Sequence, residues 1–155
     1  MSYSFFIQNL PADLIPLVNS FCCPDTDYYR DKILKIADDN GLTRFGFNYK
    51  TVPNTQRDLD NKGSILNIMR CKNEIPFLFR PLKTVYNIGS YGGKHTVERY
   101  RDKLLKGDNY ISNGEFIIAM ILSGYVFKQN NNNSPNCSFR GGVLPETKIR
   151  KPKKK

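Results

Sequence analysis

The sequence predicts an α+β fold that is mainly helical: a small globular domain with a central helix pair, a few short strands and a disordered basic C-terminal tail. Three observations support this prediction. Apolar residues recur at helical spacing in several segments, one segment alternates as a strand does, and the chain ends in a run of basic residues. With 155 residues, of which 39% are hydrophobic, the chain can form one domain with a substantial core.

The first clear element is a helix over residues 27–40. Tyr29, Ile33 and Ala37 recur every four residues and form one apolar face. Gly41 follows, and glycine readily adopts the left-handed conformation that ends a helix. This segment is expected to be a packing helix with a solvated basic face.

Residues 44–50 predict a short strand. Phe45, Phe47 and Tyr49 alternate with polar or small residues, the pattern of a strand with one buried face. Aromatics interleaved with Arg44 and Lys50 are also typical of a base-stacking platform. Packing in the core is the favoured interpretation.

Further along, residues 52–61 are polar and contain Pro53, which predicts a loop. Ile65, Ile68 and Met69 have the spacing of another short helix. The apolar segment 75–81 contains two prolines, so we expect it to be an edge strand or an extended connector.

A helix pair is predicted in residues 89–127. In the first helix, Val97, Tyr100 and Leu104 form an apolar stripe, and the cations are expected on its outer face, where they can contact a polyanion. These cations are Lys94, Arg99, Arg101, Lys103 and Lys106. The second helix begins with a capping box from Ser112 to Glu115, is apolar on all sides and ends at Gly124.

The glycine-rich start of this pair does not match a phosphate-binding loop. Three residues rather than four separate Gly89 from Gly93, and His95 follows Lys94 where a Ser or Thr is required. What remains is a helix N-terminus that could bond a phosphate oxygen, or a tight turn that needs glycine for packing. His95 is interpreted as a capping or packing residue, because no carboxylate or nucleophile can be assigned to it.

No catalytic, cofactor or metal site is predicted. The four cysteines contain no C-x-x-C spacing and are interpreted as free thiols, and the single histidine adds no familiar zinc pattern. No apolar run reaches the roughly 20 residues of a membrane-spanning helix. The N-terminal residues lack the cationic start and the apolar stretch of a secretory signal, so none is expected. We therefore expect a protein without enzymatic activity or a small-molecule substrate.

The helix pair also carries a resemblance. Its residues read Ser90-Tyr91-Gly92-x-Lys94-His95-x-x-Glu98 and then Tyr110-Ile111-Ser112-Asn113-Gly114-Glu115-Phe116-Ile117-x-Ala119-x-x-x-x-Gly124-Tyr125. This pattern resembles a short module of proteins from phages and large DNA viruses, a family without an established activity, and covers about a quarter of the chain. The resemblance implies a viral origin. A chain rich in Asn, Lys and Ile, as from an AT-rich giant virus, agrees with it.

The predicted domain ends at residue 127, and residues 128–155 are expected to be an Asn-rich linker and a disordered basic tail. The chain has a net charge of +10, and the tail supplies more than half of it. A flexible cationic strip can neutralise phosphates without reading sequence. The alternative roles of this tail are a nuclear-import signal, attraction to anionic lipid, or a solubilising end. The basic residues of the tail are Lys148, Arg150, Lys151, Lys153, Lys154 and Lys155.

Together these patterns predict a small viral accessory or virion protein that contacts the nucleic-acid backbone electrostatically, without sequence-specific readout. The expected location is the host cytoplasm or nucleus, or the virion. The alternative is a protein-interaction or minor structural virion component whose tail only assists localisation or packaging. An exposed apolar patch would favour a protein partner, and a continuous patch of exposed cations would favour nucleic acid.

Overall fold

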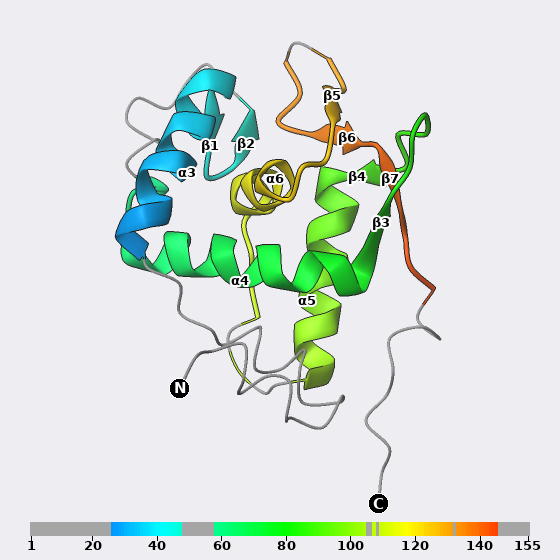
Figure 1. The fold of residues 1–155 in the computed structure, drawn as a ribbon, viewed down its shortest axis with the longest axis horizontal. Coiled ribbons are helices and arrows are strands. Elements are labelled where there is room, and N and C mark those ends of the chain that lie inside the picture. The colour runs from blue at the N-terminus through cyan, green and yellow to red at the C-terminus, as the bar shows by residue number, and fades with distance from the viewer. Residues whose placement is uncertain (1–25, 48–57, 105–106, 108, 132, 146–155) are drawn as a thin grey trace, which may run out of the picture.

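The computed structural model describes residues 26–47, 58–104, 107, 109–131 and 133–145. They form helices and short antiparallel strands, as predicted for a mainly helical α+β fold (Figure 1). In chain order the elements are α3 (Thr26–Asn40), β1 (Leu42–Thr43), β2 (Gly46–Phe47), α4 (Lys62–Leu78), β3 (Phe79–Pro81), β4 (Ile88–Gly89), α5 (Ser90–Leu104), α6 (Asn113–Leu122), β5 (Phe127–Gln129), β6 (Cys137–Phe139) and β7 (Gly141–Val143).

Helix α6 lies at the centre, where Figure 1 shows it nearly end-on between α3 and α5, with α4 crossing beneath. Its first eight residues are all buried, which an apolar helix requires on every side. The predicted capping box is confirmed, because Ser112 accepts from the Glu115 amide while Glu115 bonds the Ser112 amide. The predicted end of this helix is also confirmed, since Gly124 has a φ of 82°.

The aromatic core gathers around Phe116 of α6. Its ring meets Phe79 and Phe139 edge-on, with centroids 5.8 and 6.2 Å away. Gly93 in the first turn of α5 faces the same ring, and a Cβ at this position would overlap it. Glycine here lets α5 and α6 approach closely.

The predicted helix over 27–40 is confirmed as α3, and Gly41 ends it with a φ of 60°. The predicted strand over 44–50 is wrong at its start. A hairpin pairs Leu42 with Phe47, so Phe45 lies in the turn and is exposed. Gly46, at a φ of 117°, allows this tight reversal. Tyr49 lies outside the described residues.

Helix α4 is longer than its sequence suggests. The predicted helix at residues 65–69 is confirmed, but it continues through Pro76 to Leu78, so the extended segment is limited to β3. Ile75 and Leu78 are both buried. Pro76 lies in the last turn, and the burial of its apolar neighbours outweighs the hydrogen bond that it removes.

The strands extend the domain beyond its predicted end. β4, β6 and β5 form one antiparallel sheet, and β3 pairs with β7 in another. Cys137 and Phe139 are fully buried in the core. The predicted boundary at residue 127 is therefore wrong, because residues 128–131 and 133–145 continue the fold. The tail, residues 146–155, lies outside the described residues.

Candidate nucleic-acid interface

The predicted cationic face of α5 is divided in two by the structure. Arg99 and Lys103 are exposed, as predicted. Lys94 and Arg101 are buried, so their placement on the outer face is wrong. They face carboxylates on α4 and on α5 itself. Lys106 lies outside the described residues.

Arg101 belongs to a buried ion pair. Its side chain is 0% exposed, and its Nε donates to both oxygens of Glu74, at 2.9 and 3.2 Å. Arg70 donates to the same carboxylate at 3.1 Å, and Arg101 also bonds the side chain of Asn67 at 2.7 Å. Burial and the nearby charge of Arg101 lower the pKa of Arg70. This cluster joins α4 to α5, and the buried Arg101 within it is inaccessible to a polyanion.

Lys94 secures the connection between α5 and α6. Its Nζ donates to Glu98 at 3.1 Å and to the carbonyl of Ile111 at 3.4 Å, while the Ile111 amide donates to Glu98. Burial raises the pKa of Glu98, but hydrogen bonds from Lys94, Ile111 and His95 outweigh it and lower this pKa overall. Glu98 is therefore an ionised carboxylate that holds the connection in place.

His95 has the carboxylate partner that sequence reasoning missed. Its Nδ1 lies 2.6 Å from Glu98, which as an ionised carboxylate can only accept, so Nδ1 is the donor. In the neutral ring Nε2 is then the basic nitrogen, and it has no hydrogen-bond partner among the described residues. The signal was the His-x-x-Glu spacing on a helix. The His95 ring also packs edge-on against the Tyr91 ring, with the two ring centroids 4.6 Å apart.

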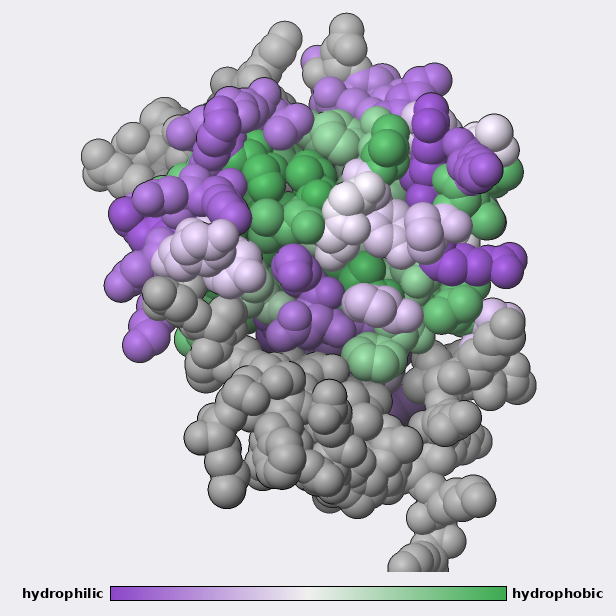
Figure 2. Space-filling view, in the orientation of Figure 1, coloured by the Kyte–Doolittle hydropathy of each residue, from purple (hydrophilic) through white to green (hydrophobic). Residues whose placement is uncertain are grey.

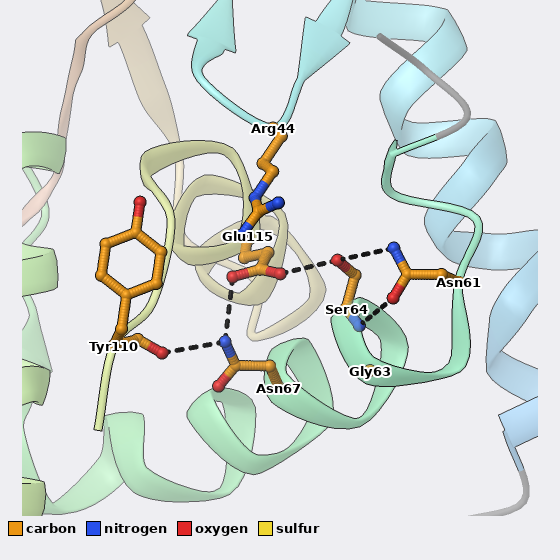
Figure 3. Close-up of a pocket in the computed structure, with 7 residues that line it drawn as sticks. All are labelled: Arg44, Asn61, Gly63, Ser64, Asn67, Tyr110 and Glu115. Atoms are coloured by element: carbon orange, nitrogen blue, oxygen red, sulfur yellow. Dashed lines mark hydrogen bonds between the residues drawn. The ribbon is translucent and has the colours of Figure 1, made fainter. Parts of the chain in front are cut away.

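A cleft of about 310 Å³ lies beside this connection. Figure 3 shows Arg44 reaching toward it from the β1–β2 turn, with Tyr110 across from it. Glu115 accepts from Ser64 at 2.7 Å and from Asn67 at 2.9 Å. Because these polar groups hydrogen-bond one another, we interpret the cleft as part of the packing contact between α4 and α6.

The described residues provide another basic region that the sequence analysis did not identify. We call it the strand surface, and it consists of Arg80, Lys83, Tyr86, Lys128 and Arg140. Its residues lie on or beside the paired strands β3–β7 and β5–β6. Lys128 pairs with Ser138, Arg80 pairs with Gly142, and the Arg140 guanidinium lies 5.0 Å from the centroid of the Tyr86 ring. In Figure 2 hydrophilic side chains, mixed with hydrophobic ones, project along the edge where Figure 1 shows β3 and β7.

Positive charge is unevenly distributed over the described residues. Up to residue 71 they include six Lys and Arg and six Asp and Glu, whereas residues 72–145 include nine against four. Cations of α3 have partners, such as Asp39 for Lys35 and Asp60 for Arg30. By contrast, the four cations of the strand surface form no ion pair with a described carboxylate.

Two absences concern the described residues only. No helix there is both long and apolar enough to cross a membrane. No group of three or more His, Cys, Asp and Glu side chains is arranged to hold a metal ion. Comparison of the chain with protein-family models, curated proteins and solved structures finds no match.

Proposed function

We propose that this protein binds nucleic acid through its phosphate backbone, without reading sequence, as a small viral accessory or virion protein. The strand surface is the folded part of the site, and the basic residues of 146–155 are its second part. The observation that carries the proposal is that the four cations of the strand surface are exposed or partly exposed and form no ion pair with a described carboxylate. The resemblance of the helix pair supports the viral context.

The expected binding has a distinct salt dependence. Each phosphate neutralised on duplex DNA contributes about −0.9 to the slope of log K against log salt. The four cations of the strand surface would give a slope of about −4, and the tail would add about −5. Exposed Arg99 and Lys103 extend the site if the polyanion also follows α5.

The test is a salt series with labelled oligonucleotides. The full chain is compared with a chain ending at Glu146 and with the double variant Lys83→Gln/Lys128→Gln. The matched control is Lys32→Gln/Lys35→Gln, which removes the same charge from α3. We expect truncation to flatten the slope most, the strand-surface variant to flatten it by about 2, and the control to leave it unchanged. Absence of binding by the full chain at near-physiological salt would refute the proposal.

A protein-interaction role is the alternative. Val85, Val126 and Val143 are each about half exposed, at 51%, 51% and 48%. Val85 and Val126 accept backbone hydrogen bonds from Gly141 and Arg140, so they border the strand surface. Apolar side chains beside cations are a composition that a protein partner can also use. This role becomes the leading one if the salt series shows no binding.

A further inference from the structure

The pair formed by Tyr86 and Arg140 is the most specific feature of the strand surface. Hydrogen bonds hold its backbone in place, because the Arg140 amide donates to Val126 at 2.8 Å and Tyr86 bridges to Gly141. The guanidinium lies over the Tyr86 ring. Its Nε is buried and has no acceptor among the described residues. A planar cation and an aromatic ring thus lie together on a hydrogen-bonded backbone.

The surroundings of this pair are open and positively charged. Arg80 lies opposite Gly142 in the β3–β7 pair and is exposed. Gly89, in the row of Ser138 and Lys128, is exposed and has open space beside it. A flat ligand therefore has open space beside Gly89, and Lys128 and Arg80 lie on the strands that pair with β6 and β7, the two strands that flank Arg140.

We infer that the strand surface takes single-stranded nucleic acid in preference to a duplex, with one base stacked on the Tyr86–Arg140 pair. This inference rests on the proposed function. Stacking requires the face of a base, which a duplex keeps inside the helix, whereas an unpaired base offers it to aromatic and guanidinium planes. Arg80, Lys83 and Lys128 would then hold the flanking phosphates.

The test compares three probes at fixed salt: a single-stranded thymidine 20-mer, a duplex of equal length, and an abasic 20-mer that keeps only the sugar–phosphate chain. Tyr86→Leu in the full chain is expected to weaken binding of the thymidine strand about 5- to 100-fold. Its affinity for the duplex and the abasic strand, and its salt slope, are expected to stay unchanged. Tyr86→Phe keeps the ring and is expected to bind normally.

The matched control is Tyr28→Leu. Tyr28 also lies under a cation, with the Lys32 Nζ 4.3 Å from its ring, but on α3. The Tyr28→Leu variant is expected to bind all three probes with unchanged affinity. Should Tyr86→Leu unfold, as judged by circular dichroism, Arg140→Lys keeps the charge but removes the planar group, and the same selective loss is expected.

The outcomes separate the inference from the proposed function. Equal losses on all three probes would show that Tyr86 is only structural and would overturn the inference. Equal affinity for strand and duplex, unaffected by Tyr86→Leu, would also overturn it and leave the proposed function standing. Failure of the unmodified chain to bind any probe would refute the proposed function itself.

Discussion

Replacing Glu74 with Gln should destabilise the domain strongly. Glu74 is 1% exposed and Arg101 0%, and the carboxylate is the only described ion-pair partner of that guanidinium. The substitution keeps the shape of the side chain but removes its charge. Arg101 would then remain buried without a counter-ion, which costs more than the lost hydrogen bonds alone.

The expected magnitude follows from this burial. Breaking a buried ion pair at one partner costs about 3–5 kcal/mol. In a domain of this size each kcal/mol lowers the melting temperature by about 2–4 °C, so a fall of roughly 6–20 °C is expected. Thermal and urea unfolding, followed by circular dichroism, measure it. The double variant Glu74→Leu/Arg101→Met should recover part of the loss, because it removes the buried charge of Arg101, whereas Arg70 still loses its bond to the Glu74 carboxylate.

The single variant Arg101→Met tests whether Arg101 is buried in the domain or contacts phosphate on the outer face of α5. Measured well below its melting temperature, it should leave the salt slope of oligonucleotide binding unchanged, because Arg101 is not on the surface. A variant with normal stability but a slope reduced by about 1 would refute this reasoning. Arg101 would then be a phosphate contact, as its position in the sequence first suggested.

Three further predictions concern packing, thiol reactivity and pH. Gly114→Ala should cost about 2–3 kcal/mol in urea unfolding, because its Cβ would overlap a β1 carbonyl, whereas Gly92→Ala, with open space, should be neutral or stabilising. Burial raises the pKa of the Cys137 thiol to about 12 and that of the Cys71 thiol still further. Peptide mapping after iodoacetamide treatment at pH 8 should therefore find both thiols unmodified until the chain unfolds. Labelling of the folded protein would contradict their burial. The lowered pKa of Glu98 makes its carboxylate stabilising at neutral pH, and this contribution is lost as pH falls below its ordinary value of 4.5. In Glu98→Gln, melting temperature should therefore fall less between pH 7 and pH 3 than in the unmodified chain, and an unchanged fall would argue against this role.

Elements marked by local signals could be predicted from the sequence. Helix α3 has a regular apolar stripe and ends at a left-handed glycine, and the start of α6 is specified by a capping box between Ser112 and Glu115. These signals act within a few residues. The elements that they mark can therefore be predicted without knowledge of the rest of the fold.

Elements defined by distant contacts could not be predicted in the same way. β6 is only three residues long and follows an Asn-rich stretch, and its place in the core depends on pairing with β4 and β5. Arg80 and Lys128 are likewise far apart in the sequence, and only strand pairing places them beside β7 and β6, which flank Arg140. The strand surface was missed for this reason.

The misplaced cations of α5 have a different explanation, because a local signal did exist. Lys94, Val97 and Arg101 are spaced at i, i+3 and i+7, so they share the face of α5 on which Val97 is buried. Arg99 and Lys103, four residues apart, share another face, which is exposed. A cation on the apolar face of a helix needs a buried carboxylate, and the glutamates of α4 and α5 supply it. Counting the charges of a helix therefore overstates its positive surface unless each cation is first assigned to a face.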